Sequence, residues 1–248
     1  MIPESPRSPE IRPMERCLIL VCAMVPSIAF LQYGIARTRV TWGDRVIWEA
    51  FCMGGLCAAF AILPELLLKK TLGIGAMVPL HGAATEAFYV AAIPEEFAKL
   101  GGVLYVMTRF DARATRYDMI MLSLAMALGF AAIENLLYLT MRAEWPNVAL
   151  SRALTAVPFH GIVGLAMGAM LTAAERSRRN RNVWLAAAIA VPILLHGGYD
   201  FPLLLVGKNH ALHGVLPAWL LMSVLAGAAV IYLCNRMWAS SWRGVQPS

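Results

Sequence analysis

The sequence predicts an all-α fold, a polytopic membrane helix bundle with about seven transmembrane helices, or eight. Hydrophobic residues make up 59% of the 248 residues and charged residues only 15%, whereas a soluble domain carries about 25% charged residues. The apolar residues also fall in long blocks, while a soluble helix needs a polar face. Mean hydropathy is +0.63. These observations together predict one membrane-embedded domain.

Seven blocks are long enough to cross a bilayer, since a spanning helix needs about 20 mostly apolar residues. They cover about 17–35, 46–68, 83–107, 119–141, 153–172, 183–205 and 215–234. Residues 1–16 carry four prolines and mixed charges, which predicts a disordered amino-terminal tail. A single transmembrane domain then covers 17–238, and 239–248 form a carboxy-terminal tail. The glycine-rich stretch 71–82 is too short to span and suits a re-entrant or interfacial piece.

The basic residues separate the apolar blocks and predict the orientation of the chain. Twelve Lys and Arg residues fall on one side of the predicted topology and eight on the other, where Arg152 is counted as a loop charge. This bias predicts an external amino terminus. The net charge of +6 is spread over these loops without a clustered face, so nucleic-acid binding is not expected.

Charged residues inside the third block are the most informative feature. Glu95, Glu96 and Lys99 lie in mid-block, where one charge costs at least about 2.5–3.5 kcal/mol on insertion scales. Lys99 is one helical turn from both glutamates and can pair with either. Pro94 removes a backbone donor and is expected to kink the helix. The group suits either activation of water by a carboxylate or a structural ion pair.

Three further blocks carry polar residues at depth. Glu134 and Asn135 lie in the fourth block, His160 in the fifth, and His196 with Asp200, one turn apart, in the sixth. At 1.5 Å rise per residue, the acid and imidazole groups fall between the midplane and the outer third of the bilayer. We therefore expect them to converge on one water-accessible site.

Other carboxylates lie nearer the ends of their blocks. Glu49, Glu65 and Glu86 are therefore interpreted as structural or interfacial groups. The sequence has no H-E-x-x-H, G-x-S-x-G or Gly-x-Gly-Asp motif, which argues against zincin-like, rhomboid-like and presenilin-like sites. The remaining carboxylates and histidines suit hydrolysis, a proton-coupled transporter, or a membrane scaffold without catalysis.

The ordered motifs resemble the PrsW family of intramembrane proteases, within the superfamily of CAAX prenyl endopeptidases and bacteriocin-processing enzymes. They are E-E-x-x-K (Glu95, Glu96, Lys99), F-x-x-x-E-N (Phe130, Glu134, Asn135), the isolated His160, and H-x-x-x-D (His196, Asp200). The wider superfamily usually has histidine and asparagine where this chain has Glu134 and Asp200. These motifs cover about half of the chain.

The resemblance implies an endopeptidase of a bacterial cytoplasmic membrane that cleaves single-span membrane proteins, similar in role to site-1 proteases of anti-sigma factors. Glu95, alone or with Glu96, would be the general base, and His160 or His196 would orient water or protonate the leaving amine. Asp200 would orient His196.

In the same hypothesis Lys99 balances the carboxylate charge and Asn135 donates to the oxyanion. The resemblance favours a metal-free glutamate mechanism with no cofactor. Glu95, His160, His196 and Asp200 are also suitable ligands for zinc or another divalent metal. Oligomeric state is left open.

Overall fold

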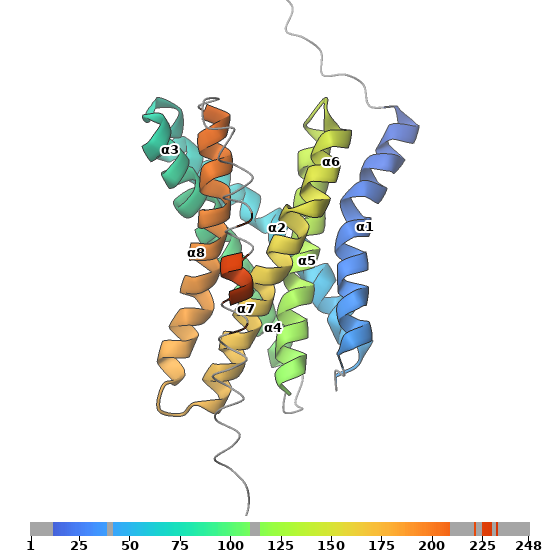
Figure 1. The fold of residues 1–248 in the computed structure, drawn as a ribbon, viewed down its shortest axis with the longest axis vertical. Helices are drawn as coiled ribbons and strands as arrows, with labels where there is room; N and C mark the ends of the chain where they lie inside the picture. The colour runs from blue at the N-terminus through green and yellow to red at the C-terminus, as the bar shows by residue number, and fades with distance from the viewer. Residues whose placement is uncertain are drawn as a thin grey trace, which may run out of the picture.

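The structure is a computed structural model that describes residues 12–38, 42–109 and 115–208, with Leu221, 225–229 and Tyr232. The helices up to residue 208 are α1 (Pro13–Arg37), α2 (Asp44–Thr71), a 3₁₀ turn (Ile74–Ala76), α3 (Pro79–Thr85), a π-helix (Glu86–Ala92), α4 (Ile93–Thr108), α5 (Arg116–Thr140), α6 (Trp145–Leu154), α7 (Ala156–Arg176) and α8 (Arg181–Lys208). The described residues contain no strand, so the predicted all-helical class is confirmed. The long helices run side by side (Figure 1).

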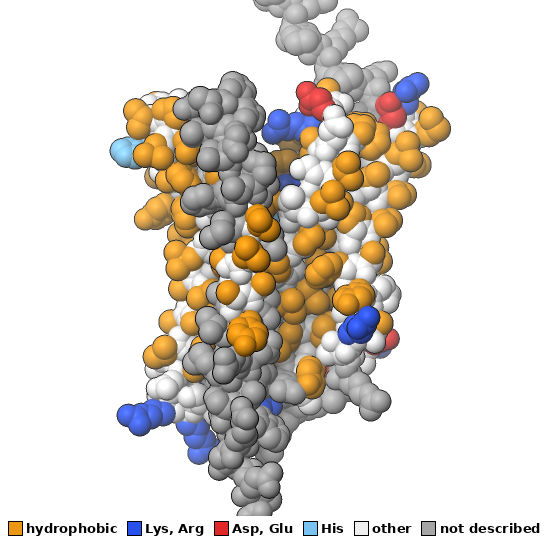
Figure 2. Space-filling model, viewed as in Figure 1, with side chains coloured by type: hydrophobic (Ala, Val, Ile, Leu, Met, Phe, Trp, Pro, Cys, Tyr) orange, Lys and Arg blue, Asp and Glu red, His pale blue; other side chains and the backbone are white. Residues whose placement is uncertain are grey.

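Five helical segments in the described part of the chain are long and apolar enough to cross a membrane. They are Pro13–Arg37, Asp44–Thr71, Tyr117–Thr140, Trp145–Arg176 and Arg181–Gly207. Figure 2 shows that hydrophobic side chains dominate the middle of this face, while charged side chains gather toward the two ends of the bundle. This banding is what a lipid-embedded protein requires, and the chain is an integral membrane protein.

The predicted count of seven or eight spans is not confirmed. The third predicted span, 83–107, is a compound helix in which α3, the π-helix and α4 follow one another without a break from Pro79 to Thr108. Of the seventh, 215–234, only Leu221, 225–229 and Tyr232 are described, and the carboxy-terminal tail 239–248 lies outside the described residues. Within 71–82 the chain forms the 3₁₀ turn and the start of α3.

The last residues assigned to the predicted disordered tail belong to a helix. Helix α1 begins at Pro13, where a proline at the first helical position costs no hydrogen bond. The side chain of Glu15 accepts from the backbone N–H of Arg12 at 3.1 Å, which satisfies a donor at the helix start. Residues 13–16 are therefore helical, and residues 1–11 lie outside the described part.

Glycines let α2 and α7 approach the central helix α5 closely. A Cβ atom on Gly129 of α5 would lie 1.8 Å from the carbonyl oxygen of Phe51 in α2. Gly164 and Gly168 of α7 approach the α5 backbone in the same way. Membrane helices associate through small residues because the apolar tails of lipid leave no hydrophobic driving force between them. This packing fixes α5 against α2 and α7.

A π-helix directly precedes the Glu95–Glu96 pair. The N–H of Ile93 donates to the carbonyl of Phe88, five residues earlier, and the next residue, Pro94, has no N–H to donate. The expected disturbance at Pro94 thus takes the form of a widened turn, a feature that is frequent at functional sites. The first turn of α4, directly after this segment, carries both glutamates.

Candidate active site

The Glu95–Glu96–Lys99 group is buried in the bundle as one ion network. Nζ of Lys99 lies 2.8 Å from Oε1 of Glu96 and 3.2 Å from Oε2 of Glu95. All three residues are at most 5% exposed. The same ammonium lies 4.0 Å from the ring centre of Phe130, which adds a favourable cation–π contact. The predicted pairing of Lys99 with the two glutamates is therefore present for both.

His196 of α8 joins this network from across the site, where it faces the glutamates of α4. Its Nδ1 lies 2.7 Å from Oε1 of Glu96, and its Nε2 lies 3.2 Å from Oδ2 of Asp200 and 3.7 Å from Oε2 of Glu95. Carboxylate oxygens surround both ring nitrogens, so the pocket favours an imidazole that donates on both sides. The predicted alignment of Asp200 with His196 is present.

His160 of α7 links the network to helix α5. Its Nε2 lies 2.8 Å from Oε2 of Glu134, and its Nδ1 lies 3.4 Å from Nζ of Lys99. An ionised carboxylate only accepts and an ammonium only donates. The neutral ring that fits both partners carries its proton on Nε2.

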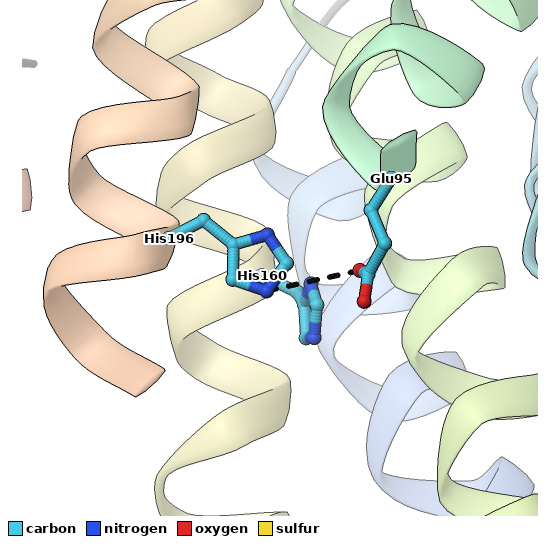
Figure 3. A group of neighbouring side chains, drawn as sticks. All are labelled: Glu95, His160 and His196. Atoms are coloured by element: carbon cyan, nitrogen blue, oxygen red, sulfur yellow. Dashed lines mark ion pairs between the residues drawn. The ribbon is translucent and has the colours of Figure 1, made fainter. Parts of the chain in front are cut away.

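The two imidazoles meet beside Glu95. Their ring centres lie 5.3 Å apart, edge to face, and Figure 3 shows the side chain of His196 directed toward the Glu95 carboxylate, with His160 alongside. Glu95, His160 and His196 come from three separate helices, α4, α7 and α8. The structure thus brings the acid and imidazole groups of separate helices to one buried place.

Asn135 reaches the network through a residue that the sequence did not single out. Nε of Arg152, in α6, lies 2.5 Å from Oδ1 of Asn135, and Nη2 lies 2.7 Å from Oε2 of Glu134. The sequence interpretation of Arg152 as a loop charge is wrong, because its side chain is only 15% exposed. A lone arginine near the end of a predicted block gave no signal of this contact.

Of the three carboxylates that the sequence predicts to be structural or interfacial, two form ion pairs with basic residues. Glu49 pairs with Arg45 at 3.0 Å on the exposed side of α2, and Glu86 pairs with Lys69. Glu65 is half-buried in α2.

The predicted metal ligands are close enough to share an ion. Donor atoms of Glu95, His160 and His196 lie within 4.8 Å of one another, and two histidines with one glutamate are a known zinc set. Asp200, the fourth predicted ligand, instead contacts His196 Nε2 at 3.2 Å, as a carboxylate that orients a ligand does. The residues fit a divalent ion in type and proximity, although Lys99 already contacts two of these donors.

Comparison with known proteins places these motifs in one family. Residues 43–237 match the model of the family described as "PrsW family intramembrane metalloprotease". The chain is 36% identical to the protein named "Protease PrsW" of Halalkalibacterium halodurans over 209 residues, which cover 82% of this chain and 91% of the relative. It is also 36% identical to that of Bacillus subtilis over 204 residues, covering 80% and 88%.

A third relative, from Oceanobacillus iheyensis and of the same name, is 31% identical over 74% of this chain and 81% of its own. No solved structure matches the chain. The family match covers all eight residues predicted for the site, and the relatives are matched over most of their length. The chain therefore belongs to the PrsW family of intramembrane proteases.

Proposed function

We propose that this intramembrane protease cleaves single-span proteins anchored in a bacterial cytoplasmic membrane, with Glu95 as the general base. The observation that carries the proposal is the unequal anchoring of two neighbouring carboxylates. Glu96 contacts both Lys99 and His196 at 2.8 and 2.7 Å. Glu95 has a single longer contact with Lys99, at 3.2 Å, and His196 lies 3.7 Å away. Glu95 is the carboxylate better able to turn toward water.

The reaction begins with a water molecule beside Glu95. Its carboxylate takes one proton while the water oxygen bonds to the carbonyl carbon of the substrate peptide. Lys99 places a positive charge 3.2 Å from Oε2 of Glu95, which is the oppositely charged partner that a buried carboxylate needs. Glu96 holds Lys99 and His196 in place through its Oε1 atom.

The leaving amine and the oxyanion need donors. His196 is suited to protonate the amine, because its Nε2 lies between Glu95 and Asp200 and can regain the proton that Glu95 takes from water. The Asp200 carboxylate favours a proton on Nε2 of His196. Asn135 would donate from its amide nitrogen to the oxyanion, and preorganised donors of this kind stabilise the transition state.

Metal use is a separate part of the proposal. Glu95, His160 and His196 would hold a divalent ion, whose chemistry would be to polarise the peptide carbonyl and to acidify water. We propose the metal-free route, because the Lys99 ammonium already supplies positive charge among these donors. Cleavage by protein treated with a chelator and assayed without added metal supports this route, while loss of cleavage that zinc restores contradicts it.

The motif order supports two finer proposals. The chain would share its catalytic design with the CAAX prenyl endopeptidases, and its substrates would include anti-sigma factors cleaved at a first, external site.

We also propose seven spans for the whole chain, with the compound helix Pro79–Thr108 and the segment 215–234 adding to the five described spans.

The function is tested with purified protein in detergent and a panel of fluorescently tagged single-span membrane proteins. The wild-type protein is expected to cut at least one of them, and Glu95→Gln is expected to cut none while melting at a similar temperature. Glu49→Gln, in an exposed ion pair of α2, is the matched control and should cut normally. Cleavage by Glu95→Gln at the wild-type rate would overturn the proposal, and so would proton flux in liposomes without any cleavage.

A further inference from the structure

Arg152 lies where two residues of α5 face the site. The guanidinium contacts Glu134 through Nη2 at 2.7 Å and Asn135 through Nε at 2.5 Å. Its Cζ atom also lies 4.1 Å from the ring centre of Tyr138, one turn further along α5. Three contacts to one helix hold a side chain that is only 15% exposed. One arginine thus joins α6 to the polar face of α5.

The bond to Asn135 determines which way that amide points. Arginine has donors and no acceptor, so the Asn135 atom facing Nε must be the carbonyl oxygen. The two N–H groups on Asn135 Nδ2 are thereby directed away from Arg152. A planar amide that is held at its oxygen presents its donors in one fixed direction, as a preorganised oxyanion donor requires.

The bond to Glu134 determines the proton position on His160. Oε2 of Glu134 accepts from Arg152 at 2.7 Å and from His160 Nε2 at 2.8 Å. A carboxylate that is ionised and held by a guanidinium keeps the imidazole proton on Nε2. Nδ1 of His160 is then left as an acceptor toward Lys99, at 3.4 Å.

We propose that Arg152 is a positioning residue of the protease, acting through Asn135 on the oxyanion and through Glu134 on His160. The inference rests on the proposed function of Asn135 as the oxyanion donor. If Arg152 only held α5 and α6 together, the ion pair with Glu134 would be sufficient. The second hydrogen bond, from Nε to the Asn135 amide, also orients the proposed oxyanion donor, which a purely structural contact would not require.

The planar guanidinium, with its several donors, explains why position 152 carries an arginine and not a lysine. Nε and Nη2 donate in parallel to two neighbouring side chains, whereas a lysine ammonium is a single point charge. Arg152→Lys should therefore keep the charge beside Glu134 and lose the fixed amide. Arg152→Met removes both contacts. The two variants separate the ion pair from the positioning of Asn135.

The test measures kcat and KM on a fluorescent single-span reporter that the wild-type protein cleaves. Arg152→Met should lower kcat by about 10²–10³-fold, the loss typical of one oxyanion donor, with KM changed by less than about threefold. Arg152→Lys should recover only part of kcat. Arg142→Met removes an exposed arginine just beyond α5 and should match the wild-type protein.

A double-variant cycle with Asn135→Ala decides the route of action. If Arg152 works through this amide, Arg152→Lys in the Asn135→Ala background should change kcat by less than about twofold. Losses that multiply in the double variant would overturn the inference, and so would a wild-type kcat for Arg152→Lys. Should Arg152→Met fail to fold, the Arg152→Lys cycle still decides.

Wild-type and Glu95→Gln proteins assayed beside these variants separate the two proposals. Cleavage that depends on Glu95 but is unaffected by Arg152→Lys and Arg152→Met overturns only the role of Arg152. A wild-type protein that cleaves no reporter, or a Glu95→Gln protein that cleaves normally, overturns the proposed function itself.

Discussion

The ammonium of Lys99 lies 2.8 Å from Oε1 of Glu96, and both side chains are almost completely removed from solvent, at 2% and 0% exposed. Burying such charges is costly unless each finds a partner. Lys99 meets this requirement with two carboxylates and the face of Phe130. The fold therefore depends on keeping this network complete, since removing one partner would leave a charge buried without its counter-charge.

Lys99→Met should destabilise the folded protein by about 3–5 kcal/mol, because two buried carboxylates lose their counter-charge. The measurement is the free energy of unfolding in detergent. Lys69→Met is the matched control, since Lys69 pairs with Glu86 while its side chain is 56% exposed. An exposed pair is worth about 0–1 kcal/mol, so equal effects of the two substitutions would contradict the buried network.

The close contact of Gly129 between α2 and α5 predicts that alanine destabilises the protein there, whereas alanine at an uncrowded glycine stabilises it. Gly129→Ala would place Cβ 1.8 Å from the carbonyl oxygen of Phe51, and overpacking of this kind costs about 1–3 kcal/mol or more. Gly101→Ala meets nothing within 4 Å and should stabilise helix α4 by up to about 1 kcal/mol. Melting temperatures of the two variants, compared with the wild-type protein, decide whether the helices approach as closely as described.

Asp200→Asn tests the orientation of His196. Asparagine keeps the shape of the side chain but no longer favours a proton on the Nε2 atom that lies 3.2 Å away. We expect kcat to fall by about 10²-fold or more, since general acid–base catalysis contributes about 10²–10⁴-fold, with KM little changed. Asp44→Asn, on an exposed residue at the start of α2, should leave both constants unaltered. A normal kcat for Asp200→Asn would remove Asp200 from the mechanism.

The site residues were predictable from the sequence because the membrane makes buried charges conspicuous. Glu95 and Lys99 stand out in an apolar block, and helical spacing alone predicts their contact. Arg152 was not predictable in the same way, because an arginine near the end of an apolar block usually faces the bilayer surface. Only the break between α6 and α7 at Thr155 and the packing of α6 on α5 bring it to Glu134.

Element boundaries were less predictable than element types. Hydropathy predicts a span over 83–107, but it does not predict that the segment is divided by a π-helix. Pro94 indicated a disturbance at the right place without specifying its form. The helical start at Pro13 was missed because prolines and charges predict disorder by composition, whereas one of those prolines begins α1.

The most direct test of the shared site is the coupling between Glu96 of α4 and His196 of α8, which lie 100 residues apart in sequence and 2.7 Å apart in space. The free energy of unfolding is measured for Glu96→Gln, for His196→Asn and for the double variant. A shared pocket predicts a coupling energy of about 0.5–3 kcal/mol between the two substitutions. Effects that add to within about 0.3 kcal/mol would contradict the convergence of these helices on one site.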